Sequence, residues 1–229
     1  MASISPRDGR APAEAARYLD GVTFDGIPLA ALDFYEDLEA DNSKAFWTEH
    51  KHIYDAQVKA PLEALAEALA KDFGTPKFFR PYRDVRFSKD KTPYKTHQGI
   101  WFGESSMYLH VAASGLFVAG GYWDTSSAQV DRLRRAVDED VPGNALVKAI
   151  ASVKRKGFNI GGHQLSRVPS GYDKEHPRAD LLRYKTLTAS SELGCPDWLP
   201  TAKAKTEITK AWKAISPLVS WLDTHVGRG

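Results

Sequence analysis

Residues 98–123, QGIWFGESSMYLHVAASGLFVAGGYW, decide the fold of this chain. β-Branched and aromatic residues recur there in partial alternation over 98–102, 107–113 and 116–123, as in strands that bury one face. Ser114-Gly115 separates the last two runs and has the composition of a tight hairpin turn. The stretch therefore predicts an antiparallel hairpin or meander in the middle of the chain.

The residues before this stretch are patterned as helices. Apolar residues recur at helical spacing over 29–38, and Asp-Asn-Ser at 41–43 is suited to end one helix and cap the next. A second apolar stripe covers 46–73, where we expect Pro61 to kink or restart the helix and Gly74 to end it. The N-terminal third is thus predicted to be helical.

Helices return after the predicted strands. Asp-Thr-Ser-Ser at 124–127 offers an N-cap, and a further helix is expected after Pro142-Gly143, ending at Gly157. Short extended pieces are expected at 158–160, 165–168 and 185–189, followed by a last helix from about residue 201. Because strands and helices segregate along the chain, the sequence predicts an α+β fold, with an antiparallel or mixed sheet packed by N-terminal and C-terminal helices.

Length and composition limit the classes of protein to which this chain can belong. A chain of 229 residues that is 42% hydrophobic can bury a large core, and we expect one domain over 28–227 after a loosely ordered tail over 1–27. The 31 Lys and Arg are balanced by 29 Asp and Glu, so any anion binding must be local. The single Cys195 excludes an internal disulfide and fits a reducing compartment such as the cytoplasm. No apolar run is long enough for a signal peptide or membrane span, so we expect a soluble protein with no membrane partner.

Cations gather in residues 77–97, KFFRPYRDVRFSKDKTPYKTH, where only Asp84 and Asp90 oppose them. Such a density of positive charge is costly unless the charges lie in water, pair with carboxylates or hold an anionic ligand. Pro81 and the run at 85–87 favour a strand, which would place Arg80 and Arg86 on one side and Arg83 on the other. The candidate anion-binding residues of this segment are Arg80, Arg83, Arg86, Lys91 and Lys95.

A second segment, 172–185, again mixes aromatic residues with cations and adds Arg178 and Lys185 to the anion-binding candidates. If the two segments meet in space, they form one basic cleft. The side chains considered for proton transfer there are Asp90, Tyr94, His97 and His176. His110 lies in a predicted strand and is interpreted as a core or edge histidine.

The motifs FRPYRDVRFSKDKTPYKTH, GLFVAGGYW, VPSGYDKEHPRADLLRYK and WLDTHVG follow one another along the chain. In this order they resemble the family called domain of unknown function 2461, a family of conserved hypothetical proteins, from about Pro28 to Gly227. The resemblance implies no activity. Its hallmark positions fall on Arg80, Arg83, Arg86, Asp90, Lys91, Pro93, Tyr94, Lys95, Arg178 and Lys185. Residues 123–127 depart from the family pattern, which puts only a helix cap in doubt.

Three hypotheses of function remain. The favoured one is a basic cleft for a small phosphorylated or carboxylated ligand, and the second is a nucleic-acid-binding accessory module. The third is a structural or interaction protein whose arginines are neutralised by carboxylates such as Glu36, Glu39 or Asp55. The sequence has no nucleophile elbow, Walker-type loop or dinucleotide fingerprint, so it assigns neither a reaction class nor a cofactor. No metal site is predicted, because His50 and His52 would point away from each other on a helix.

Overall fold

The computed structural model describes residues 23–86 and 88–228. Its helical elements are α1 (Ala30–Ala40), α2 (Lys44–Ile53), the π-helical η2 (Tyr54–Lys59), α3 (Ala60–Phe73), the 3-10 turn η3 (Gly103–Ser105), α4 (Ser127–Asp138), α5 (Asp140–Arg155), α6 (Ala179–Leu182) and α7 (Lys203–His225). Its strands are β1 (Pro76–Phe78), β2 (His97–Phe102), β3 (Met107–Ala112), β4 (Gly115–Tyr122), β5 (Asn159–Gly161) and β6 (Leu187–Gly194). The predicted α+β class is confirmed.

The strands form one six-stranded antiparallel sheet in the order β1-β2-β3-β4-β6-β5. The predicted meander is its centre: β2, β3 and β4 follow one another, and Gly115 adopts a φ of +102° at the turn between the last two. β6 returns from much later in the chain to pair with β4 on one side and β5 on the other. This pairing inserts the C-terminal part of the chain into the sheet.

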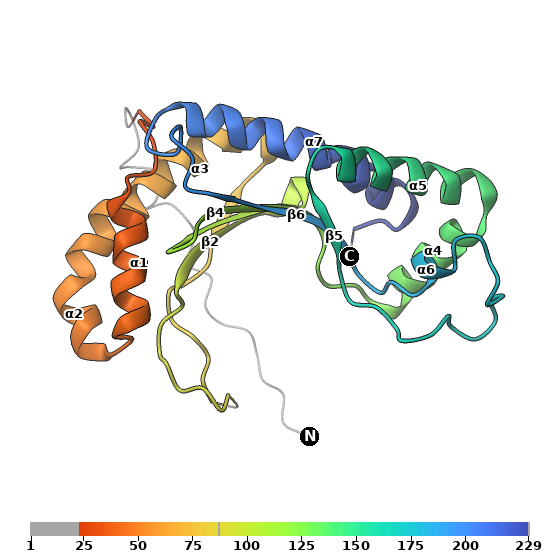
Figure 1. The fold of residues 1–229 in the computed structure, drawn as a ribbon, viewed down its shortest axis with the longest axis horizontal. Helices are drawn as coiled ribbons and strands as arrows, with labels where there is room; N and C mark the ends of the chain where they lie inside the picture. Colours follow the sequence, from red (N-terminus) through yellow and green to blue (C-terminus); the bar gives the residue numbers. More distant parts are fainter. Residues whose placement is uncertain (1–22, 87, 229) are drawn as a thin grey trace, which may run out of the picture.

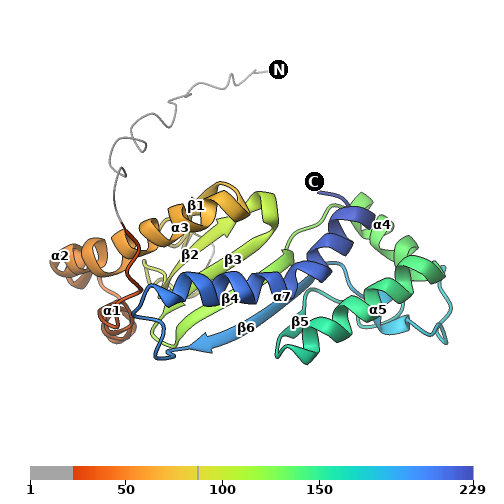
Figure 2. The same cartoon turned by 90° about the horizontal axis from the view of Figure 1, so that it is seen from above.

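Helices cover one face of the sheet. α3 and α7 run across it (Figure 2), and α7 contacts β4 and β6. The fully buried Trp212 of α7 packs edge-on against Phe73 of α3 and Phe102 of β2, with ring centroids 4.7 and 5.1 Å apart. Large apolar side chains at this contact hold the two helices on the same face.

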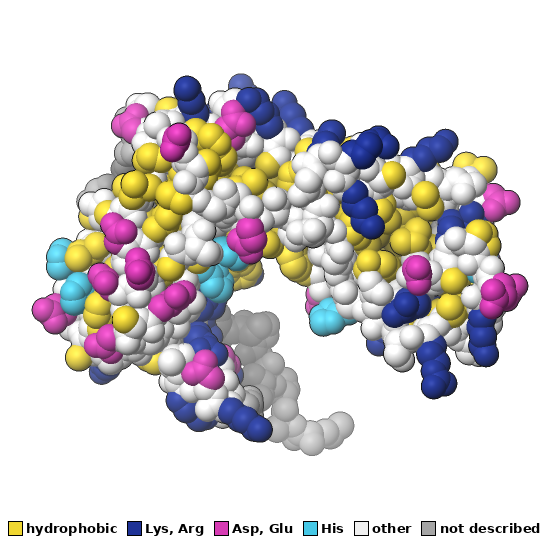
Figure 3. Space-filling view, in the orientation of Figure 1, with side chains coloured by type: hydrophobic (Ala, Val, Ile, Leu, Met, Phe, Trp, Pro, Cys, Tyr) yellow, Lys and Arg dark blue, Asp and Glu magenta, His cyan; other side chains and the backbone are white. Residues whose placement is uncertain are grey.

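The two ends of the sheet carry separate helical groups (Figure 1). α1 and α2 lie at one end, whereas α4, α5 and α6 lie at the other end beside β5. Beneath the sheet, on the face opposite α7, Figure 3 shows the molecule hollowed between these groups. No helix of the described residues covers this face of the sheet, here called the uncovered face, and it forms the roof of a concave surface.

Local sequence signals account for several helix boundaries. The Ser43 side chain accepts a hydrogen bond from Phe46 N at 3.1 Å, and Ser126 with Gln129 forms a capping box at the start of α4. α3 ends at Gly74, as expected. Pro61 stands in the first turn of α3, which restarts the helix after the π-helical η2.

Other expectations need correction. Residues 165–168 form no strand, and the strand expected at 185–189 is β6, which spans Leu187–Gly194. Of the predicted tail, residues 1–22 lie outside the described part of the chain, but Phe24 and Ile27 are buried in the core. The packed region thus includes residues before the predicted boundary at 28. No helix in the described part of the chain is long and apolar enough to cross a membrane.

Candidate functional site

The uncovered face of the sheet carries a groove of about 1030 Å³, here called the aromatic groove. Period-two alternation places its lining: Met107, Leu109 and Val111 of β3 are buried, whereas Tyr108 and His110 between them are partly exposed. The side chains that give the groove its chemical character are Phe79, His97, Trp101, Tyr108, His110, Phe117, Trp123 and Arg228.

Six of these rings, those of Phe79, His97, Tyr108, His110, Phe117 and Trp123, lie next to one another in a continuous layer. His110 stacks on Phe117 with centroids 4.6 Å apart and planes at 12°. Tyr108 meets Trp123 edge-on at 6.0 Å and lies 6.2 Å from Phe79. A Cβ at Gly99 would lie 2.6 Å from the Tyr108 hydroxyl, so the glycine lets this ring lie close against β2.

Two histidines lie side by side in this layer. His97 of β2 and His110 of β3 have ring centroids 4.8 Å apart. Burial, and next the proximity of His97, lowers the pKa of His110 to about 4. Burial and then Lys95 lower the pKa of His97. Both imidazoles are therefore neutral at pH 7, and each retains a nitrogen that can accept a proton.

The lowered pKa of His110 predicts a pH dependence of stability. In the unfolded chain the pKa of His110 is 6.5. Between this pH and about pH 4, His110 is protonated in the unfolded chain but largely neutral in the folded chain, so the free energy of unfolding falls as the pH drops. His110→Phe keeps an aromatic ring but removes the titrating group. Between pH 7 and pH 4 we expect its free energy of unfolding to fall by on the order of 2 kcal/mol less than that of the parent chain. Urea unfolding at several pH values measures this difference. The same dependence of the free energy of unfolding on pH in the two proteins would contradict it.

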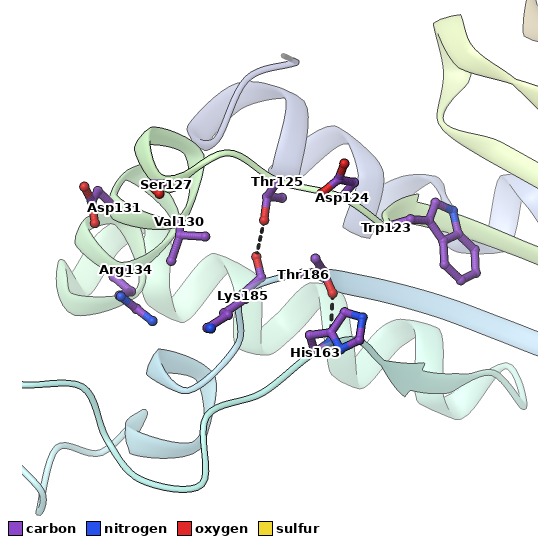
Figure 4. A pocket seen from close by; sticks show the side chains of 10 residues that line it. All are labelled: Trp123, Asp124, Thr125, Ser127, Val130, Asp131, Arg134, His163, Lys185 and Thr186. Atoms are coloured by element: carbon purple, nitrogen blue, oxygen red, sulfur yellow. Dashed lines mark hydrogen bonds between the residues drawn. The ribbon is translucent and has the colours of Figure 1, made fainter. Parts of the chain in front are cut away.

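A second hollow, the cationic pocket, adjoins the aromatic groove and has a volume of about 580 Å³. Its lining includes Arg134 of α4, Lys185 just before β6 and His163 just after β5. Figure 4 shows the charged ends of Arg134 and Lys185 facing each other across it. Two hydrogen bonds fix its frame: Thr125 Oγ1 donates to the Lys185 carbonyl at 2.8 Å, and the His163 amide donates to Thr186 Oγ1 at 2.7 Å.

The two cations of this pocket have no acidic partner among residues 23–86 and 88–228. Asp124 and Asp131 also line the pocket, but neither forms an ion pair with Arg134 or Lys185. The nearest hydrogen bond of the Arg134 guanidinium is a long one to Leu182 O at 3.4 Å. Asp124 and Asp131 balance the overall charge of the lining, but neither holds Arg134 or Lys185 in an ion pair, so both cationic groups can bind an anion.

Residues 79–86 and 88–96, here called the basic arm, extend below the sheet (Figure 1) and do not form the predicted strand. The arm is closed by one bridge between Tyr82 and Tyr94 and by backbone bonds from Arg83 N to Pro93 O and from Lys95 N to Pro81 O. Pro81 and Pro93 have no N–H to donate, which limits a regular ladder. The expected alternation of arginines across two faces is therefore wrong.

Acidic residues of the arm itself neutralise two of its arginines. Arg83 binds Asp90 and Thr92, and Arg86 donates to both carboxylate oxygens of Asp84 at 2.9 and 2.7 Å. Bonds from Thr92 N and Arg83 lower the pKa of Asp90 to about 2, so this carboxylate is an unsuitable proton acceptor at neutral pH. The partners are thus local and are not the helix residues Glu36, Glu39 or Asp55.

The remaining cations of the arm lie apart from the cationic pocket. Lys91 donates to Val85 O at 2.9 Å, and Arg80 is exposed. Lys95 lies over the Phe79 ring, 5.3 Å from its centroid, and so borders the aromatic groove together with Lys77. Lys95 is therefore a predicted anion ligand of the arm that contacts a ring of the groove lining.

Tyr94 anchors the arm to the helices. It is buried and stacks on Trp47 of α2 with centroids 4.3 Å apart, while its backbone donates to Asn42 Oδ1 at 3.0 Å and accepts from Asn42 Nδ2 at 3.1 Å. Burial raises the pKa of Tyr94, so the phenol is protonated at neutral pH. These contacts assign Tyr94 a structural part in place of the expected proton transfer.

The paired bonds of Asn42 predict a local effect. We expect Asn42→Ala to speed amide hydrogen exchange over 81–95 by about 10-fold, because two bonds that hold the arm are lost while the helices remain packed. Exchange in α7 serves as the internal control and should not change. Equal acceleration in both regions would show that Asn42 supports the whole fold.

Arg178 and His176 lie outside both hollows. Arg178 is 7% exposed and donates to the carbonyl oxygens of Val137 and Asp138 at the end of α4, at 2.7 and 2.9 Å, and to Asn144 and Asp140 of α5. His176 lies 3.5 Å from Asp138 and accepts from the Arg178 amide at 3.0 Å. Arg178 therefore lines neither the cationic pocket, which holds Lys185, nor the aromatic groove, so it does not contribute to a cleft shared by the two basic segments.

Sequence reasoning missed most of the residues that line the two hollows. Arg134 and His163 lie outside the two basic segments, and Tyr108, Phe117 and Trp123 were interpreted only as strand residues. A signal for the last three was present, because aromatic residues occupied the outward positions of strands whose inward positions were already apolar. The described residues contain no group of three or more His, Cys, Asp or Glu side chains suited to a metal ion.

Residues 30–221 match the family model described as Conserved hypothetical protein (DUF2461). The chain belongs to this family, as its motifs suggested. No curated protein and no solved structure matches the chain. The site geometry is therefore the basis on which a function is inferred.

Proposed function

From the geometry of this DUF2461 chain, we propose that it binds a small phosphorylated or carboxylated ligand, with the anionic group in the cationic pocket. The proposal depends on one observation: Arg134 and Lys185 line the same hollow. Arg134 comes from α4, and Lys185 comes from the segment just before β6. Oxygen anions accept charge-assisted hydrogen bonds from both kinds of side chain. The start of α4 at Ser127 also lines the pocket and adds the positive end of a helix dipole.

We thus place anion binding in the cationic pocket and not in the basic arm, where the sequence suggested it. Lys185 is retained from the predicted ligands, whereas Arg83, Arg86 and Arg178 have carboxylate partners. Such pairing supports the structural alternative for those three arginines alone. The exposed Cys195 remains compatible with the proposed cytoplasmic location.

Isothermal titration calorimetry of the full chain tests the proposal. Inorganic phosphate, pyrophosphate, succinate and glucose 6-phosphate are the probes, each at about 20 and 200 mM salt. We expect at least one of them to bind and to raise the melting temperature, with a modest loss of affinity at the higher salt. Absence of heat and of stabilisation for every probe would overturn the proposal.

Binding of single-stranded nucleic acid is the second candidate function. The observation that favours it is the open row of rings in the aromatic groove, which is bordered by Lys77 and Lys95 on the side away from the cationic pocket. A twelve-residue oligonucleotide titrated under the same two salt conditions distinguishes the candidates. Affinity for a polyanion falls steeply with salt, because several counterions are released on binding.

A further inference from the structure

The aromatic groove and the cationic pocket share a wall. Trp123 and Asp124, which follow β4, line both hollows. Trp123 is 43% exposed, and its ring meets Tyr108 in the groove. Figure 4 shows Trp123 at the end of the pocket opposite Arg134, so a single ligand that reaches from the cations to the rings extends along the pocket into the groove.

The two hollows differ in chemical character. The groove is lined mostly by apolar and aromatic side chains, whereas the pocket carries charged and hydroxyl groups. The groove's rings are held in place by the sheet, since Tyr108 lies close against Gly99 and His110 stacks on Phe117. Prearranged ring faces are suited to stack on another planar ring and lose little side-chain entropy in doing so.

We propose that the aromatic groove holds a planar aromatic ring of the same ligand whose anionic group occupies the cationic pocket. The ligand class is then an aromatic ring linked to a phosphate, of which a nucleoside monophosphate is the simplest representative. This inference rests on the proposed function and narrows it. The same ring-phosphate unit occurs in free nucleotides and in single-stranded nucleic acid, so the experiment includes both.

Calorimetric titration of the full chain with AMP, UMP, ribose 5-phosphate and inorganic phosphate measures the contribution of the ring. We expect the nucleotides to bind at least about 10-fold more tightly than ribose 5-phosphate, because stacking of one base typically gives that advantage. Trp123→Leu and Tyr108→Leu should each remove most of this advantage and leave the affinity for ribose 5-phosphate within about twofold. Tyr82→Leu, which alters an exposed ring of the arm outside both hollows, is the matched control and should keep the full advantage.

Each outcome bears on the inference. Equal affinity for ribose 5-phosphate and the nucleotides would overturn the ring site while the anion site stands, whereas failure of all phosphates to bind would overturn the proposed function as well. Tighter binding of a twelve-residue oligonucleotide than of AMP, with loss in Trp123→Leu, would support the ring site and identify nucleic acid as the source. A dimer of the parent chain that dissociates in Trp123→Leu, measured by light scattering, would overturn the inference, because the groove would then be a contact between copies.

Discussion

Arg178→Ala is expected to lower the free energy of unfolding by about 2–5 kcal/mol, the largest effect anticipated for a single substitution in this chain. The guanidinium is almost fully buried between α4 and α5, where it binds the carbonyl oxygens of Val137 and Asp138 at 2.7 and 2.9 Å. Carbonyl groups at a helix end have no partner within the helix. Removal of the arginine leaves the buried Val137 carbonyl and the part-buried Asp138 carbonyl without this donor, and it also frees Asp140 of its ion pair.

Urea unfolding monitored by circular dichroism measures this loss. Arg167→Ala is the matched control, because Arg167 is an exposed arginine of the preceding loop, and its effect should stay within about 0.5 kcal/mol. Arg178→Lys should rescue little, since an ammonium group cannot reproduce the planar fork that reaches four acceptors. Unchanged stability of Arg178→Ala together with loss of anion binding would instead make this residue a ligand, as the sequence suggested.

Lys185→Glu is expected to weaken binding of the best anionic probe by about 10- to 100-fold. The lysine side chain is exposed and makes no hydrogen bond or ion pair among the described residues, so its reversal should leave the unfolding midpoint unchanged. A charge-assisted hydrogen bond typically contributes about 1.5–3 kcal/mol, which corresponds to this range of affinity. Arg134→Glu should have a similar effect, because its guanidinium faces Lys185 across the pocket.

Arg135→Glu provides the matched control for both variants. Arg135 is exposed, follows Arg134 on α4 and does not line the pocket, yet its substitution changes the net charge by the same amount. Screening in moderate salt should limit its effect to about twofold. Comparable losses in Arg135→Glu and Lys185→Glu would indicate diffuse attraction to the surface and would contradict a specific pocket. Calorimetry of the three variants with one probe gives the comparison.

Several boundaries of the fold follow from local chemistry. The helix start after Ser43, the stop at Gly74 and the capping box at Ser126 depend on hydrogen bonds between residues a few positions apart. The hairpin at Gly115 depends on a backbone conformation that glycine adopts without strain. Such signals can be interpreted from the chain alone, which is why the meander and most of the helices around it were predicted. The exceptions are α5, which begins at Asp140, ahead of Pro142-Gly143, and the short α6, which was not predicted.

The basic arm shows where local interpretation fails. The run at 85–87 favours a strand, but the two prolines limit the ladder, and Asp84 and Asp90 bind amides and arginines within the arm. For Arg178, too, local sequence was not enough to predict the environment of the side chain. A cationic residue in a polar stretch suggested an exposed ligand-binding position, and only its distant contacts with α4 and α5 identify it as buried.

The sequence by itself determined the family, the α+β class, the central meander and the presence of cations that need a partner. Only the tertiary structure decided which face of the sheet remains uncovered and which cations meet. Helix caps and strand alternation are short-range, because they are set by bonds and side-chain directions within a few residues. The meeting of Arg134 with Lys185 in a pocket that extends to Trp123 depends instead on β6 returning to pair with β4, a long-range contact that local patterns do not specify.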